Sequence, residues 1–247
     1  HSFPTRRSSD LLTGNMPAQP SANYLLDGLF GADVVNVPDR SDRDRVLAET
    51  YDAAREAGMI PYLVPYGGSS PTGALGYAFA MTELMEQVEA GEIPGGKAPD
   101  WIVFGTSSGG THAGLTLGAR LTGYNGRILG ISIDEDAAWL KKHVSALASD
   151  ASELLGRRID FGPDDVEASD AYCTAGYGVL TDAEREAIHL FARHEGLLLD
   201  PVYTGRAAAG LVDFVRTGFF GKDQTVLFWH TGGQPALFAD RYAPDLG

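Results

Sequence analysis

Short apolar runs alternate with longer amphipathic stretches along this chain, and that alternation restricts its fold more than any other feature. Runs with the length and composition of buried strands occupy residues 33–37, 60–65, 101–104, 128–133 and 225–230. Amphipathic stretches of helical length occupy residues 21–30, 41–57, 72–90, 111–121, 136–155, 181–194 and 205–217. Strands that are joined by helical crossovers build parallel sheets. The sequence therefore predicts an α/β protein with open, mostly parallel sheets and helices on both faces.

Several of these helices have recognisable ends. Gly31 and Gly58 stand where two helices should stop, because glycine accepts the left-handed backbone conformation that ends many helices. Thr181 and Glu184 have the spacing of a capping box, in which each side chain accepts a hydrogen bond from the other residue's amide. These residues predict two helix ends and the start of a third helix.

Composition and charge narrow the class of partner. The 247 residues, of which 44% are apolar, suffice for the core of one large domain or two small ones. A formal net charge of -14 repels phosphate backbones and anionic lipid heads, so neither nucleic acid nor a membrane is an expected partner. Cys173 is the only cysteine, which rules out an internal disulfide and favours a reducing compartment. Because no apolar run approaches the ~20 residues of a membrane span, the sequence predicts a cytoplasmic protein.

A glycine-rich turn, Gly105 to Thr111, comes directly after the apolar strand 101–104 and directly before a predicted helix. Unpaired backbone amides converge at such a helix start, and the helix dipole adds partial positive charge, so the turn suits an anion such as phosphate. It has neither the Gly-Lys-Ser/Thr of a Walker motif nor the spacing of a dinucleotide fingerprint. The same turn also fits a plain connector, or a phosphate-binding module without catalysis.

A serine hydrolase is the main alternative from another class. Gly105-Thr-Ser107-Ser-Gly109 matches the nucleophile elbow of hydrolases, and Asp200 and His230 follow in the hydrolase order. However, His230 ends an apolar strand, whereas a triad histidine usually lies on a loop that reaches over the nucleophile. The sequence also lacks a His-Gly-Gly-Gly oxyanion segment.

Four motifs in a fixed order carry a more specific signal. They are Gly67-Gly-Ser-Ser-Pro-Thr-Gly-Ala-Leu-Gly-Tyr77, the turn continuing as Thr111-His-Ala-Gly114, Leu198-Leu-Asp-Pro-Val-Tyr-Thr-Gly205, and His230-Thr-Gly-Gly233. Together they closely resemble the family of D-cysteine desulfhydrases and aminocyclopropane-carboxylate deaminases. The resemblance runs from about Gly14 to Phe238, nearly the whole chain.

This resemblance implies a two-domain enzyme of fold type II, with the tryptophan-synthase-beta-like fold and pyridoxal 5'-phosphate as cofactor. It assigns the cofactor phosphate to Ser107, Ser108, Gly109, Gly110 and Thr111, and the pyridine nitrogen to Thr231. It places Tyr203 and Thr204 at the catalytic cleft and gives substrate binding to Gly68 and Ser69. It implies a homodimer when the protein is complete, and no metal is expected.

Two positions bear on the substrate that the resemblance implies. The deaminases carry glutamate where this chain has Thr204 and leucine where it has Thr231, so both residues follow the desulfhydrase pattern. A carboxylate beside the pyridine nitrogen keeps that nitrogen protonated and makes the ring a strong electron sink, whereas a threonine hydroxyl supplies only a neutral hydrogen bond. The weaker sink suffices when a good leaving group departs. The implied reaction is β-elimination from D-cysteine to give pyruvate, ammonia and hydrogen sulfide. An aminocyclopropane-carboxylate deaminase and an L-cysteate sulfo-lyase are the alternatives within the family.

The resemblance also requires a lysine that binds the cofactor as a Schiff base, and this chain lacks a suitable one. Its four lysines are Lys97, Lys141, Lys142 and Lys222, each of which has the setting of an exposed charge. In the family the cofactor lysine precedes the region that begins here. Moreover, Thr5 to Leu11 resembles a translated sequencing adapter. We therefore predict that residues 1–11 are an artefact, 12–65 the remainder of a small domain and 66–247 most of a large one. This fragment should be inactive.

Overall fold

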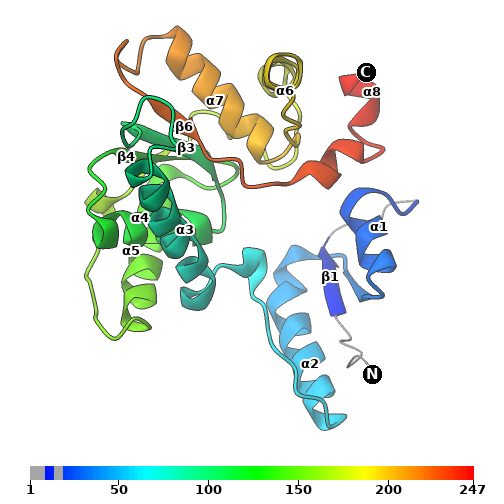
Figure 1. The fold of residues 1–247 in the computed structure, drawn as a ribbon. Coiled ribbons are helices and arrows are strands. Elements are labelled where there is room, and N and C mark those ends of the chain that lie inside the picture. The colour runs from blue at the N-terminus through cyan, green and yellow to red at the C-terminus, as the bar shows by residue number, and fades with distance from the viewer. Residues whose placement is uncertain (1–8, 14–18) are drawn as a thin grey trace. The chain divides into compact units, whose positions relative to one another are not determined.

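The computed structural model describes residues 9–13 and 19–247, which form two compact units (Figure 1). In the first unit the chain runs to Val64 and resumes at Pro235–Gly247, and the second unit is Pro65–Gln234. The carboxyl-terminal residues thus group with the amino-terminal ones, although the sequence predicted a single domain from 66 to 247. Most of the adapter-like segment lies outside the described residues, and its artificial origin stays a prediction, as do the predicted domain boundaries.

The first unit contains a pair of parallel strands and short helices. Strand β1, Ser9–Thr13, pairs with β2, Asp33–Val37. The helices of this unit are α1, Ala22–Leu29; α2, Arg43–Glu56; and α8, Ala243–Leu246. Gly31 and Gly58 follow α1 and α2 with φ values of 72° and 78°, so the predicted helix ends are confirmed.

The strand predicted at 60–65 is wrong. These residues form neither helix nor strand, and Ile60 is fully exposed while Val64 is 61% exposed. Their apolar composition is typical of a buried strand, but a strand needs a neighbour for its backbone amides and carbonyls. No strand among the described residues pairs with this segment.

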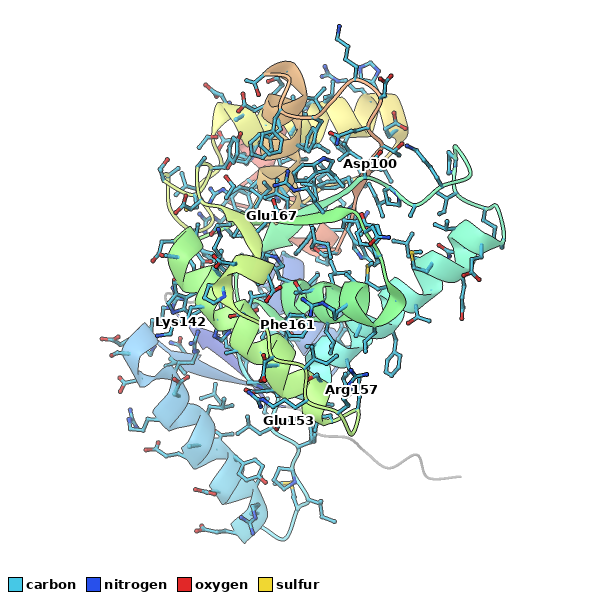
Figure 2. All side chains as sticks on the ribbon, turned by 90° about the vertical axis from the view of Figure 1, so that its left-hand side faces the viewer. Asp100, Lys142, Glu153, Arg157, Phe161 and Glu167 are labelled. Carbon is cyan, nitrogen blue, oxygen red and sulfur yellow. The ribbon has the colours of Figure 1, made fainter. Side chains whose placement is uncertain are left out.

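The second unit is built on a four-stranded parallel sheet with the order β5-β4-β3-β6. The strands are β3, Trp101–Thr106; β4, Arg127–Ser132; β5, Glu167–Ser169; and β6, Val226–Phe228. The predicted parallel α/β architecture is therefore confirmed. Strand β5 was not predicted, because three residues are too few for a hydrophobic pattern. Glu167 of β5, which Figure 2 labels, accepts two hydrogen bonds from Arg127 at the start of β4. Their lengths are 2.8 and 2.6 Å.

Helices cover both faces of this sheet (Figure 1). Helices α3, Pro71–Glu89; α4, Gly110–Thr122; and α5, Ala137–Glu153, enclose two apolar clusters on one face. Helices α6, Asp182–Glu195, and α7, Thr204–Arg216, lie on the other, where Ala207 of α7 packs on Val103 and Ile131. The capping box of Thr181 and Glu184 is present at the start of α6, as predicted. Among the described residues, no helix is both long and apolar enough to cross a bilayer.

Helices α3 and α4 approach each other closely because α4 has glycine at every fourth position. A Cβ atom on Gly114 would lie 2.2 Å from the carbonyl oxygen of Ala74 and 2.6 Å from Tyr77 Cβ. A Cβ atom on Gly118 would lie 2.6 Å from Met81 Cβ, and one on Gly110 would lie 2.7 Å from Ser69 Oγ. These positions lie on one face of α4, so they let the whole helix rest against α3. The contact also brings the loop before α3 against the glycine-rich turn before α4.

We expect Gly114→Ala to lower the free energy of unfolding by about 1 to 3 kcal/mol, because the methyl group would force α3 and α4 apart. Alanine is the better helix former by about 1 kcal/mol, so its propensity acts against this loss. Gly76→Ala on α3 is the matched control, since its Cβ would meet nothing within 4 Å. Urea unfolding followed by circular dichroism measures the free energy of unfolding. From most to least stable, the expected order is Gly76→Ala, wild type and Gly114→Ala. Equal stability of the two variants would contradict this account of the helix contact.

Candidate functional site

The carboxyl ends of the parallel strands bring most of the predicted site residues to one edge of the sheet. Thr106 at the end of β3 pairs with Ser132 at the end of β4, and Val103 pairs with Phe228 at the end of β6. Because the strands run in the same direction, the glycine-rich turn and Thr231 emerge at the same edge. The start of α7 reaches this edge too, since a Cβ atom on Gly105 would lie 3.1 Å from the Tyr203 carbonyl oxygen.

The glycine-rich turn is held by the loop that precedes α3. The backbone amide of Gly110 donates to Ser69 Oγ at 2.9 Å, and Ser69 Oγ donates to Ser108 Oγ at 2.8 Å. Gly67 and Gly68 have φ values of 65° and 66°, a conformation that favours glycine. The structure therefore brings Ser69, one of the two predicted substrate-binding residues, against the predicted phosphate-binding turn, and Gly68 directly precedes it. Ser69 supports the turn directly.

The start of α4 has the chemistry that a phosphate group requires. Gly109 precedes the helix with a φ of 85°, and its carbonyl oxygen accepts from the Ala113 amide. The amides of Thr111 and His112 make no hydrogen bond with any described residue. The hydroxyl-bearing side chains of Ser107 and Thr111 are half-buried beside them. Two unpaired amides, nearby hydroxyls and the positive end of the helix dipole fit the phosphate of the implied cofactor.

Tyr203 precedes α7, and its hydroxyl lies 2.5 Å from the hydroxyl of Tyr177. Burial raises the pKa of Tyr203 far above its ordinary value, and the bond to Tyr177 and the charge of Asp134 act in the same direction. Tyr203 thus keeps its proton at neutral pH. The sequence did not identify Tyr177, because it lies in a loop without periodicity and only its contact with Tyr203 reveals it. Asp134 was missed as well; its Oδ1 is buried and bonds to no described residue.

Thr204 is buried, and its side chain faces a carboxylate. Its hydroxyl accepts from the Asp200 amide at 2.8 Å and donates to Asp200 Oδ1 at 2.7 Å. Asp200 also accepts from the amides of Val202, Tyr203 and Thr204 at 2.7 to 2.8 Å. The hydroxyl of Thr204 therefore has no proton left to donate to a ligand. This geometry supports a part in holding the Tyr203 backbone, and direct catalysis by Thr204 remains only a prediction.

The three residues of the alternative hydrolase hypothesis do not form a catalytic triad. Asp200 uses its carboxylate to hold the start of α7, as its four accepted hydrogen bonds show. His230 contacts the backbone with both ring nitrogens: Nε2 lies 3.1 Å from the Leu198 carbonyl oxygen, and Nδ1 accepts from the Gly232 amide at 3.1 Å. Within the described residues, no hydrogen bond joins Ser107 to His230 or His230 to Asp200. This arrangement lacks the proton relay that a serine nucleophile needs.

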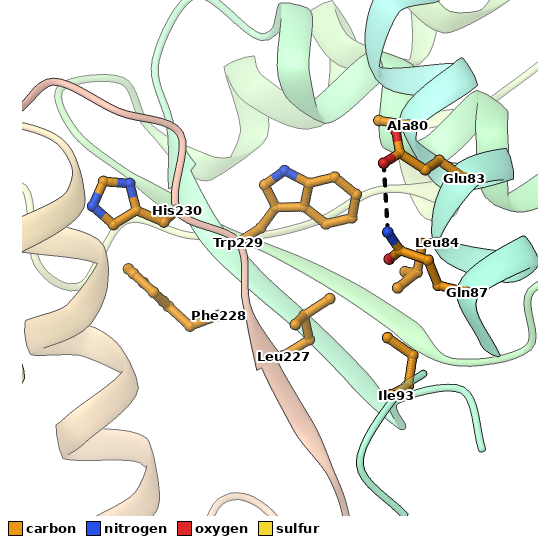
Figure 3. A pocket seen from close by; sticks show the side chains of 9 residues that line it. All are labelled: Ala80, Glu83, Leu84, Gln87, Ile93, Leu227, Phe228, Trp229 and His230. Atoms are coloured by element: carbon orange, nitrogen blue, oxygen red, sulfur yellow. Dashed lines mark hydrogen bonds between the residues drawn. The ribbon is translucent and has the colours of Figure 1, made fainter. Parts of the chain in front are cut away.

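Among the described residues, no hydrogen bond or ion pair joins a lysine side chain to the glycine-rich turn. His143, which follows Lys142 on α5, does contact it, since its Nε2 lies 3.2 Å from the Ser108 carbonyl oxygen. Lys97 is exposed in the loop before β3 and contacts Asp100 at 3.4 Å. Lys141 and Lys142 are on α5, where Lys142 is exposed (Figure 2), and Lys222 is exposed in a turn before β6. A groove of about 310 Å³ lies between α3 and β6 and is lined by Leu84, Leu227 and Trp229 among others (Figure 3). None of the residues predicted to bind the cofactor lines this groove.

Comparison with known proteins identifies the family of this chain. The profile of the family described as pyridoxal-phosphate dependent enzymes matches residues 13–232. D-cysteine desulfhydrases of Salmonella typhi and Salmonella typhimurium are each 37% identical over 219 residues, which is 89% of this chain. The chain spans 64% of the length of these relatives.

Two solved structures are similar as well. A crystal structure of an ACC deaminase homologue is 35% identical with a TM-score of 0.80, and the match covers 96% of this chain and 68% of that one. O-ureido-L-serine synthase shares the fold at 15% identity with a TM-score of 0.55, over 94% of this chain and 67% of its own.

Proposed function

Because this chain belongs to the family of pyridoxal-phosphate-dependent enzymes, we propose that the edge formed by β3, β6 and α7 holds that cofactor. We further propose that the whole protein is a D-cysteine desulfhydrase-like lyase. The observation that carries the first proposal is the start of α4, where two unpaired amides and the serine-rich turn suit a phosphate group. The second proposal is supported by 37% identity to D-cysteine desulfhydrases.

The residues of the edge then divide into distinct tasks. Ser107 to Thr111 hold the phosphate, and Thr231 hydrogen-bonds the pyridine nitrogen. When bound, the cofactor withdraws electrons and so makes the α-proton of an amino acid acidic. Tyr203, kept neutral by burial and by Tyr177, holds a proton at its hydroxyl oxygen for the reacting group. Gly68 and Ser69 form the side of the site that receives the substrate.

The proposed reaction converts D-cysteine and water to pyruvate, ammonia and hydrogen sulfide. The α-proton and the sulfur leave from neighbouring carbons, and the remaining fragment is hydrolysed. Thr231 favours this reaction over deamination of a cyclopropane, because its hydroxyl supplies only a neutral hydrogen bond. Thr204 favours it as well, because it places no carboxylate where the deaminases carry glutamate. Aminocyclopropane-carboxylate deaminase and L-cysteate sulfo-lyase activities are the alternatives for the whole protein. We also propose that it is a cytoplasmic homodimer.

We propose that the lysine needed for the covalent link lies in the part of the relatives that this chain does not span. No hydrogen bond or ion pair of the described residues joins any of the four lysine side chains to the turn, so this chain alone should bind the cofactor reversibly and remain inactive. The upstream sequence of the source DNA tests this proposal. A reading frame without a lysine-bearing segment before the junction would contradict it.

Cofactor binding is best measured by equilibrium dialysis of the 247-residue chain against pyridoxal phosphate and against pyridoxal. Thr111→Val should weaken pyridoxal-phosphate binding by about 10-fold, because it removes one hydrogen bond to a charged group, worth about 1.5 kcal/mol. Pyridoxal, which lacks the phosphate, should bind both proteins equally. Thr122→Val at the other end of α4 is the matched control and should not change either affinity.

Three further outcomes would oppose the proposals. After borohydride reduction, mass spectrometry should find no stoichiometric adduct on a single lysine; one adduct per chain at Lys97, Lys141, Lys142 or Lys222 would overturn the missing-lysine proposal. Labelling of Ser107 by a fluorophosphonate would instead support the hydrolase alternative. An unchanged affinity of Thr111→Val for pyridoxal phosphate would remove the turn from the cofactor site.

A further inference from the structure

Arg206, in the first turn of α7, is fully buried and uses its guanidinium group to join separate parts of the second unit. Its Nη1 donates to the carbonyl oxygen of Ile133 at 2.7 Å and to that of Gly176 at 3.0 Å. Its Nη2 donates to the carbonyl oxygen of Val179 at 2.8 Å. Because a guanidinium is rigid and planar, these bonds fix the three carbonyl groups relative to α7.

Each of these segments carries a polar group of the proposed site. Gly176 and Val179 flank Tyr177, and Ile133 directly precedes Asp134. Arg206 itself follows Tyr203 by three residues on the same chain segment. One side chain therefore connects the backbone on both sides of the Tyr177–Tyr203 hydroxyl pair.

The loop that carries Tyr177 has an irregular backbone. Its residues form neither helix nor strand, and Gly176 and Gly178 have φ values of 94° and 69°. Its own backbone bonds include a turn from the Gly176 amide to the Cys173 carbonyl at 2.9 Å and a long one of 3.5 Å from Val179 to Gly176. The bonds from Arg206 attach the backbone of this loop to α7 on both sides of Tyr177.

Glu184 holds the guanidinium from the other side. Its Oε1 accepts from Arg206 Nε at 2.7 Å, and both side chains are almost completely buried. Burial alone would raise the pKa of Glu184, but the hydrogen bonds from Thr181 and Arg206 outweigh it and lower that pKa. Glu184 is therefore charged at neutral pH, and the pair is neutral as a whole.

Stability alone is a weak reason for such a pair, because apolar residues of similar volume often stabilise a fold as well as a buried ion pair does. Here the pair also satisfies three carbonyl groups at fixed positions. We propose that Arg206 and Glu184 are positioning residues, which set the distance between the hydroxyl groups of Tyr177 and Tyr203. The inference rests on the proposed function for its catalytic meaning, because Tyr203 is assigned to the reaction there.

The test uses the full chain labelled with 3-fluorotyrosine and fluorine NMR, which reports on each of its ten tyrosines. Tyr177→Phe and Tyr203→Phe assign the two resonances. Arg206→Lys keeps the charge but not the fork of donors, and Glu184→Gln keeps the shape but not the charge. Arg216→Lys and Glu186→Gln are matched controls, because Arg216 and Glu186 form an exposed ion pair between the same two helices, α7 and α6.

In Arg206→Lys and Glu184→Gln we expect both tyrosine resonances to shift toward the position of an exposed fluorotyrosine. The two control variants should leave them unchanged. If both test variants melt at a lower temperature while these resonances stay in place, the pair only stabilises the fold and the proposal is wrong. Should Arg206→Lys not fold, Glu184→Gln decides alone. The fluorine NMR measurement needs no cofactor. The positioning proposal can therefore be contradicted while cofactor binding is observed, and the cofactor proposal can be contradicted while the tyrosine resonances shift as expected.

Discussion

Asp200→Ala is expected to lower the free energy of unfolding by about 3 to 5 kcal/mol. The Asp200 carboxylate is fully buried and accepts hydrogen bonds from the amides of Val202, Tyr203 and Thr204 and from the Thr204 hydroxyl. Alanine would leave these donors without an acceptor, and each buried donor that loses its partner costs about 1 to 3 kcal/mol. Water that enters beside α7 would return part of this loss. Urea unfolding at pH 7 measures the difference.

Asp200→Asn is the matched control for shape. An amide side chain retains one acceptor oxygen in the same position, so about half of the stability loss should remain. Because the donors include the amide of Tyr203, both variants should also disturb the tyrosine pair. A variant Asp200→Ala that unfolds at the same urea concentration as the wild type would show that α7 begins correctly without this carboxylate.

The second large effect is a loss of stability in acid that arises from His112. This histidine lies on α4, packs edge-on against the Phe104 ring, and is completely buried. Neither of its ring nitrogens has a hydrogen-bond partner among the described residues. Burial lowers its pKa from the ordinary value of 6.5 to about 3.

The sign of the effect follows from the two pKa values. Below pH 6.5 the unfolded chain binds a proton at His112 and the folded protein does not, so stability falls as the pH falls toward 3. At about 1.4 kcal/mol per pH unit, the loss is about 2.7 kcal/mol at pH 4.5 and approaches about 5 kcal/mol near pH 3. Denaturant unfolding at several pH values between 4.5 and 7.5 would show this slope.

His112→Leu is the control, because it has no proton to bind in either state. Its stability should change less between pH 7 and pH 4.5, with a difference from the wild type of about 2 to 3 kcal/mol. The carboxylates titrate in both proteins and cancel in this comparison. Parallel pH profiles for the two proteins would mean that the imidazole finds a partner or becomes protonated in the folded state.

The sequence predicted most helices and strands because their patterns reflect burial within the second unit. Strands 101–104, 128–133 and 225–230 correspond to β3, β4 and β6, and the boundaries differ by a few residues. The strand predicted at 60–65 is wrong for the opposite reason. Its residues are apolar, but they are exposed and no described strand pairs with them. Composition indicates that a segment favours burial, whereas a strand also requires a neighbouring strand for its backbone hydrogen bonds.

The site was predictable only where one short motif contains all its parts. The turn of Ser107 to Thr111 is such a motif, and the structure places it at the start of α4. The role of Thr204 could not be predicted from sequence, because no sequence pattern shows that its hydroxyl donates to the Asp200 carboxylate. Tyr177 and Arg206 escaped for the same reason. Tyr177 lies 26 residues before its partner Tyr203. Arg206 lies 22 residues after Glu184 and 73 residues after Ile133.

The division of the chain into units also determines which unit is impaired when residues are lost from either end. The second unit is continuous from Pro65 to Gln234, whereas the first needs residues up to Val64 and again Pro235–Gly247. As a chain is made from its amino terminus, the second unit has all its residues before the first unit is complete. A deletion at the amino terminus and a premature stop near the carboxyl terminus therefore impair the same unit. Both leave the residues of the proposed phosphate site in a continuous segment.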